Sequence, residues 1–156
     1  MKTLQDNKKI AVLGAGTMGP GIAQVYAMGG YQVTMWTRSE STREKAKAAL
    51  RAQLDTFAQE GEIKAEDVES IYARVSFAMT VAVAGADFIQ ETIVENRDAK
   101  AALYQQLASC VGPEAIIASN TSAMNIFEIV PEKLLPQQLI CHWYSPPQLI
   151  PLVEVV

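Results

Sequence analysis

The stretch from Lys9 to Gly19 reads KIAVLGAGTMG and decides the fold. Its first five residues are an apolar run that predicts a buried strand, and the next six contain the pattern G-x-G-x-x-G. The residues that follow recur at the spacing of one helix face, namely Met18, Ile22, Val25 and Tyr26. A strand that turns through glycines into a helix is the setting in which this pattern binds a dinucleotide.

Each glycine of the turn has a physical task. Gly14 permits the tight turn, Gly16 lets the backbone approach a pyrophosphate, and Gly19 lets helix and strand pack closely. The helix N-terminus adds free N–H groups and the positive end of its dipole, and we assign Thr17 and Met18 to the same phosphate site. A plain tight turn without a ligand stays open as the alternative.

Apolar runs and helix-spaced segments alternate along the rest of the chain. Strands are predicted at 31–36, 74–77, 87–92, 115–119, 138–143 and 151–156, and helices at 18–28, 41–60, 67–72 and 97–110. This alternation predicts an α/β fold, a Rossmann-like, doubly wound, mostly parallel sheet with two added C-terminal strands. We take residues 1–156 as one dinucleotide-binding domain.

Composition excludes several classes of protein. Half of the 156 residues are hydrophobic and the formal net charge is −4, which argues against a disordered tail or a nucleic-acid surface. The polar start lacks the apolar core of a signal peptide, and no apolar run approaches a membrane span. Two cysteines are too few for a disulfide scaffold, so we expect a cytoplasmic protein, with Cys110 in the core.

The end of the second strand bears on the choice of cofactor. An Asp or Glu for the adenosine ribose normally stands there, about 20 residues after the glycines. Thr37 occupies that place, and the following Arg38 could pair with a 2′-phosphate, so we lean to NADP over NAD. Glu40 could still serve a ribose in NAD. Residues Ser41–Glu44 also fit a capping box for the next helix.

His142, the only histidine, points to acid–base chemistry. If the last two strands form a hairpin centred on Gln148, residues equally distant from it pair, and His142 then faces Glu154. Their Cβ atoms would lie about 5 Å apart on one face. The carboxylate would favour the imidazolium and fix which ring nitrogen holds the proton. A hydrogen-bonded core histidine beside Trp143, with an exposed glutamate, is the alternative.

Four motifs occur in order along the chain: GAGTMG at 14–19, ETIVEN at 91–96, SNTS at 119–122 and HWYSPPQLIPLVE at 142–154. Together they resemble the nucleotide-binding domain of the 3-hydroxyacyl-CoA dehydrogenases, over nearly the whole chain. The resemblance implies oxidation of a 3-hydroxyacyl-CoA to the 3-ketoacyl-CoA, or the reverse. Hydride transfer would use NAD or NADP, in fatty acid metabolism.

The resemblance also implies roles for single residues. His142 stands at the general base and Glu154 at the carboxylate that orients it. Ser122 matches a serine near the substrate oxygen, and Asn120 lies in the loop facing the reacting end. An ordinary turn at 120–122 is the alternative, because such residues bond their own backbone.

For the cofactor, the resemblance places Glu95 and Lys100 nearby and Ser145 at the nicotinamide end, where the family usually has Asn. A helix-entry charge and a solvated helix face are the alternatives for Glu95 and Lys100. No metal site is expected.

Two further departures from the family pattern keep other functions open. Residues 57–66 hold only Lys64, where fatty acyl-CoA members carry a lysine cluster for the CoA phosphates. The C-terminal motif is closer to relatives that oxidise free hydroxy acids, such as carnitine or gulonate dehydrogenases. A free 3-hydroxy acid is therefore an alternative substrate, and a non-catalytic dinucleotide-binding or sensing module is an alternative of another class.

The chain stops at Val156 within an apolar strand. The helical second domain of the family, which completes the substrate pocket and the dimer, is absent from it. We expect this chain by itself to bind dinucleotide but turn over little, and a full-length protein to act on a small-molecule substrate as a homodimer.

Overall fold

The computed structural model describes residues 9–81, 83 and 85–156, and the polar start of the chain lies outside them. One seven-stranded sheet runs in the order β3-β2-β1-β4-β5-β6-β7. Its strands are β1 Lys9–Leu13, β2 Gln32–Trp36, β3 Val75–Ala78, β4 Phe88–Glu91, β5 Ile116–Ser119, β6 Gln138–Trp143 and β7 Val153–Val155. All neighbours pair parallel except β6 and β7, which pair antiparallel. The predicted doubly wound sheet with two added strands is confirmed.

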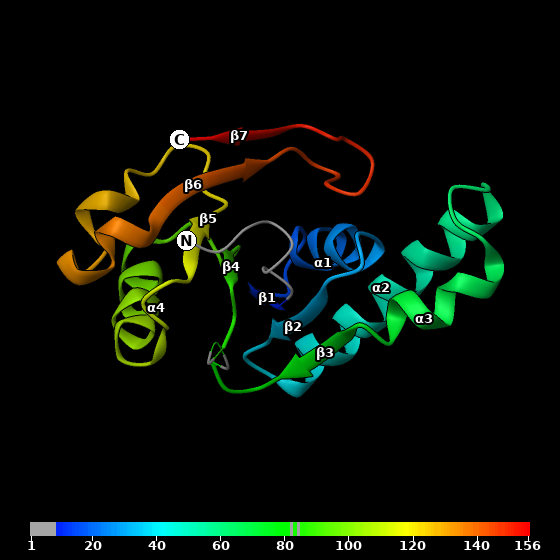
Figure 1. Cartoon of the computed structure of the whole chain (residues 1–156), viewed down its shortest axis with the longest axis horizontal. Helices are drawn as coiled ribbons and strands as arrows, with labels where there is room; N and C mark the ends of the chain where they lie inside the picture. The colour runs from blue at the N-terminus through cyan, green and yellow to red at the C-terminus, as the bar shows by residue number, and fades with distance from the viewer. Residues whose placement is uncertain (1–8, 82, 84) are drawn as a thin grey trace.

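Helices cover both faces of the sheet (Figure 1). They are α1 Gly19–Met28, α2 Glu40–Gln59, α3 Val68–Tyr72 and α4 Arg97–Cys110, with 3₁₀ turns at Ala65–Asp67, Ile126–Glu128 and Glu132–Gln137. Successive residues of β1 point to opposite faces, so Ile10 and Val12 pack with α1–α3 while Ala11 and Leu13 pack with α4. Two apolar layers result, which explains why β1 is apolar at every core position.

The predicted element boundaries agree with the structure to within two residues at each end. The N-cap of α4 is Asn96, as predicted, with its Oδ1 accepting from the Ala99 N–H at 2.9 Å. The predicted capping box at Ser41–Glu44 is wrong, because Ser39 caps α2 by accepting from the Thr42 N–H. Cys110 is exposed rather than buried, since the buried stripe of α4 ends at Leu107.

Two close approaches hold the glycine turn in place. Gly14 has φ +124°, and a Cβ there would lie 2.6 Å from the Thr92 carbonyl oxygen. Gly19 approaches the Gly14 carbonyl oxygen so closely that a Cβ would lie 2.0 Å from it.

A Cβ on Gly21 would meet Gln148 Oε1 at 2.4 Å, so the loop between β6 and β7 packs directly on α1. The first helix and the last hairpin therefore lie side by side.

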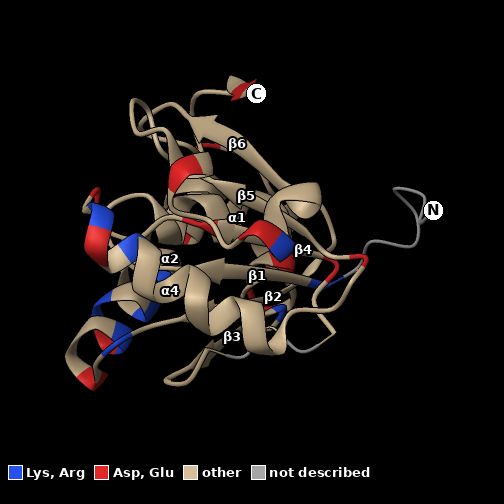
Figure 2. Ribbon diagram, turned by 90° about the vertical axis from the view of Figure 1, so that its left-hand side faces the viewer, with Lys and Arg blue, Asp and Glu red and all other residues tan. Residues whose placement is uncertain are grey.

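The surface carries both signs of charge. On the side of the molecule drawn in Figure 2, Lys and Arg positions are interspersed with Asp and Glu positions. Among the described residues no helix combines the length and apolar character needed to cross a membrane.

Candidate active site

A crevice opens at the carboxyl ends of the parallel strands, on both sides of the glycine turn. Its first part is a cavity of about 460 Å³ lined by Gly14–Gly16, by Trp36–Arg38 at the end of β2, and by Thr92–Val94 after β4. Ligands of doubly wound sheets bind at this edge, where the strand order reverses between β1 and β4.

The second part of the crevice, about 540 Å³, shares Gly16 and Thr92–Val94 with the first. It adds Thr17 and Met18 of the predicted phosphate site and Glu95 of the predicted cofactor site. From the predicted reacting end it adds Asn120, Ser122, His142 and Ser145. A third cavity of about 340 Å³ also reaches His142, and its lining includes Ser122, His142 and Glu154. Segments distant in sequence thus meet around the imidazole.

The pairing of His142 with Glu154 is the one predicted from the hairpin centre. The strand register puts His142 opposite Glu154, and His142 Nδ1 lies 2.8 Å from Glu154 Oε2. Hydrogen bonds from His142 and then Tyr144 lower the pKa of the Glu154 carboxyl. An ionised carboxylate only accepts, so Nδ1 carries the proton of this bond. The Nε2 atom of a neutral ring then has its lone pair free to take a proton.

Asn120 ties the loop after β5 to the strand that carries the histidine. Its Oδ1 accepts from the backbone N–H of Trp143 at 2.8 Å, and its Nδ2 lies 3.5 Å from Thr92 Oγ1. Asn120 therefore fixes the backbone next to His142, which an ordinary solvent-exposed turn would not do.

The first cavity of the crevice has no acidic residue among the described residues that line it. Thr37 and Arg38 line the first cavity as predicted, Thr37 being buried and Arg38 exposed. Glu40, which could have served a ribose, instead forms an ion pair with Arg43.

Residues 9–156 match the family model of the 3-hydroxyacyl-CoA dehydrogenase NAD binding domain. The chain belongs to this family. A probable 3-hydroxybutyryl-CoA dehydrogenase from Bacillus subtilis is 37% identical over 151 residues, which is 96% of this chain and 53% of that protein. L-carnitine dehydrogenase from Streptomyces coelicolor is 31% identical over 157 residues, which is 100% of this chain and 49% of that protein.

The solved structure of 3-hydroxybutyryl-CoA dehydrogenase from Escherichia coli superposes on this chain with a TM-score of 0.88. The two sequences are 32% identical. The superposition covers 95% of this chain and 32% of the chain in that structure. The chain thus spans about half the length of the curated relatives that it matches. The resemblance drawn from the four motifs is confirmed, and so is the Rossmann-like fold.

Lys100 lies away from the solvated face of α4. Its side chain is 1% exposed, and it lines neither part of the crevice. The solvated-face alternative for Lys100 is therefore wrong. The burial of Lys100 could have been predicted from the helical spacing, because the buried face of α4 consists of Lys100, Leu103, Tyr104 and Leu107.

Glu91 begins the ETIVEN motif, and no role was predicted for it from the sequence. In the structure it is fully buried at the end of β4, and both its oxygens lie 2.7 Å from Lys100 Nζ. A carboxylate at the end of an apolar strand and a lysine on a buried helix stripe could have been paired from sequence.

Proposed function

We propose that the protein carrying this domain oxidises a 3-hydroxyacyl-CoA to the 3-ketoacyl-CoA, or catalyses the reverse. The observation that carries the proposal is one crevice lined by both the glycine turn and His142, whose partner is Glu154. Phosphate binding and proton transfer thus share one site. Membership of the 3-hydroxyacyl-CoA dehydrogenase family supports this reaction class over a sensing module.

The residues present fit a nicotinamide dinucleotide. A Cβ built on Gly16 would meet nothing within 4 Å, so the turn leaves open space where a pyrophosphate would approach the N-terminus of α1. Arg38 and Thr37 would hold the adenosine end, and Glu95 and Ser145 line the other end. When bound, the nicotinamide supplies the acceptor or donor of hydride.

His142 would act as the general base. Its Nε2 takes the proton of the 3-hydroxyl as the carbonyl forms, and ionised Glu154 stabilises the resulting imidazolium through Nδ1–H. Ser122 lines the cavities on both sides of His142, where its hydroxyl can donate to the substrate oxygen. Asn120 holds the strand that carries the base.

The test of this function is calorimetric titration with NAD and NADP side by side, followed by turnover assays of the full-length protein. Binding of either dinucleotide, with turnover of a 3-hydroxyacyl-CoA, is the expected result. Absence of binding of both cofactors up to millimolar concentrations would contradict the proposal.

Arg38 and the missing acid favour NADP, and we expect the chain to bind it more tightly than NAD. A carboxylate at the end of β2 repels a 2′-phosphate and accepts from ribose hydroxyls. We therefore expect Thr37→Asp to move the affinity ratio toward NAD by about tenfold. The same titrations measure this ratio, and Ser41→Asp, exposed and outside the lining of this cavity, is the matched control. Tighter NAD binding by the unaltered chain would contradict the preference.

Two alanine substitutions in the turn should separate stability from binding. Gly16→Ala places its methyl in open space, so we expect an unchanged melting temperature but dinucleotide affinity lower by about tenfold or more. Gly14→Ala forces a Cβ against the Thr92 carbonyl at positive φ, so we expect a lower melting temperature. Thermal melts and titrations of both variants decide it, and a stable Gly16→Ala variant with full affinity would contradict the phosphate site.

A free 3-hydroxy acid is the second candidate substrate. Lys64 is the only basic residue in 57–66, and its Nζ lies 3.7 Å from Glu66 Oε1 in an exposed pair. This segment offers little positive charge for CoA phosphates. Substrate profiling of the full-length protein tests the idea, and activity confined to CoA thioesters would eliminate it.

We further propose that residues 1–156 act with a helical second domain that completes the substrate pocket, in a cytoplasmic homodimer. Coverage of about half of each relative supports the additional domain. Exposed apolar Phe127 and Val156 border the cavity beside His142, a surface that such a domain could cover. The free thiols of Cys110 and Cys141 fit a reducing compartment. Light scattering of the full-length protein measures its oligomeric state.

A further inference from the structure

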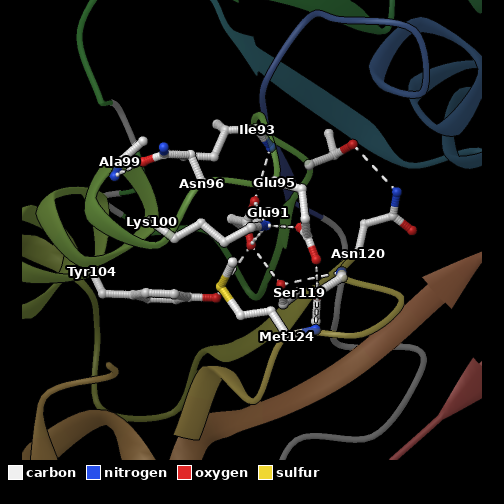
Figure 3. A network of polar contacts seen from close by, with 12 residues as sticks. Glu91, Ile93, Glu95, Asn96, Ala99, Lys100, Tyr104, Ser119, Asn120 and Met124 are labelled. Carbon is white, nitrogen blue, oxygen red and sulfur yellow. Dashed lines mark hydrogen bonds and ion pairs between the residues drawn. The ribbon is translucent and has the colours of Figure 1, made fainter. Parts of the chain in front are cut away.

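A pair of opposite charges is buried directly behind the crevice. Glu91 is 0% exposed at the end of β4, and Lys100 is 1% exposed in the first turns of α4. The ammonium lies 2.7 Å from each carboxylate oxygen (Figure 3). Burying two charges is costly unless geometry and hydrogen bonds compensate, so this pair calls for an explanation.

The remaining contacts of Glu91 come from donors. The backbone N–H of Ile93 lies 2.8 Å from Oε1, and the hydroxyls of Ser119 and Tyr104 lie 2.5 and 3.3 Å from Oε2. With Lys100, these groups supply hydrogen-bond donors to both oxygens of the Glu91 carboxylate. These donors come from the loop after β4, from α4 and from β5, so Glu91 on β4 fixes Lys100 relative to the sheet.

Lys100 has a second partner, and this one faces the crevice. Its Nζ lies 3.2 Å from Glu95 Oε2, while the Thr121 hydroxyl donates to Glu95 Oε1. The Glu95 side chain is 45% exposed and lines the crevice together with Met18 and His142. In Figure 3 the Lys100 side chain points toward both carboxylates, Glu91 and Glu95. Of the three charges, only the Glu95 carboxylate is open to a ligand.

We propose that Glu91 is a positioning residue for dinucleotide binding. It fixes the Lys100 ammonium behind the crevice, and Lys100 in turn holds Glu95 where its carboxylate accepts hydrogen bonds from hydroxyls of the bound nucleotide. Lys100 thus acts through Glu95, because its buried Nζ lines neither part of the crevice. This inference rests on the proposed cofactor site.

The charges must be removed together for a clean test. A lone buried charge destabilises the fold, whereas the double variant Glu91→Gln/Lys100→Met leaves neither charge behind. We would measure the dissociation constant of NAD or NADP, whichever the unaltered chain binds tighter, by calorimetry on the full chain. The double variant, Glu95→Gln and the triple variant that combines all three substitutions form a thermodynamic mutant cycle with the unaltered chain.

We expect the double variant to weaken binding by about tenfold. In the Glu95→Gln background the same two substitutions should change affinity by less than about twofold, because they act through Glu95. A purely structural role would instead give equal losses in both backgrounds, and that result would overturn the proposal. Glu91→Met/Lys100→Met, which also leaves neither charge behind, serves as the second variant if the first double variant does not fold, with the same expected dependence on Glu95.

Tyr104→Phe is the matched control within the cluster. It removes one donor to Glu91 but leaves both contacts with Lys100, so it should lower the melting temperature and keep affinity within about twofold. If the unaltered chain binds neither dinucleotide, the proposed function fails and this inference fails with it. If it binds, and the double variant binds equally well, only the inference fails.

Discussion

Replacing His142 by Gln is expected to lower the turnover of the full-length protein by about 10²–10⁴-fold, the range that one general base contributes. Glutamine can keep a hydrogen bond to Glu154 but cannot take a proton at neutral pH. The crevice retains its glycine turn, so dinucleotide affinity should stay within about twofold. Steady-state kinetics and calorimetric titration of the same preparation measure both quantities.

The matched control for this variant is Val155→Thr, on the exposed strand next to Glu154. It should leave turnover unchanged, because Val155 pairs with Cys141 rather than with the histidine. A His142→Gln enzyme that keeps more than about a tenth of the turnover would show that another group takes the proton.

The pH dependence of turnover should reflect the lowered pKa of the Glu154 carboxyl. Hydrogen bonds from His142 and Tyr144 lower the pKa of Glu154 in the folded protein. Such a pair is intact above the ordinary carboxyl pKa and is lost as the pH falls through the lowered value. The contribution of Glu154 to turnover should therefore persist to more acidic pH than a free carboxylate would allow. A pH–rate profile compared between the unaltered protein and Glu154→Gln measures it.

The local parts of the site could be predicted from the sequence because they depend on short-range geometry. The hairpin register follows from a loop centred on Gln148, so the partner of His142 was predictable once two strands were assumed. The glycine turn was predictable because Gly19 approaches the Gly14 carbonyl within one strand–turn–helix unit. The approach of Gly14 to the Thr92 carbonyl after β4 joins distant segments and was not predicted.

What escaped prediction depends on contacts between elements. The cap of α2 is Ser39 rather than Ser41, because the helix begins at Glu40, one residue before the predicted start. The fit of Gly21 against Gln148 joins residues at opposite ends of the chain, and no local pattern marks it. The burial of Lys100 in an ion pair was not predicted, because lysine is ordinarily solvated and its partner Glu91 stands on a different element.

Removing Lys100 by itself should destabilise the fold more than any surface change. Lys100→Met leaves the Glu91 carboxylate fully buried without its counter-charge, and breaking a buried pair in this way costs about 3–5 kcal/mol. We expect that loss in the free energy of unfolding, measured by urea denaturation without cofactor. Lys64→Met removes a lysine from an exposed pair and should leave the urea midpoint within experimental error.

The double variant Glu91→Gln/Lys100→Met should recover much of this loss, because replacing both members of a buried pair is often nearly neutral. Equal urea midpoints for the single and double variants would contradict a paired buried charge. Recovery of stability without recovery of dinucleotide affinity would separate the two roles of the cluster. The fold needs only that the buried charges cancel, whereas binding needs the ammonium that holds Glu95 in place.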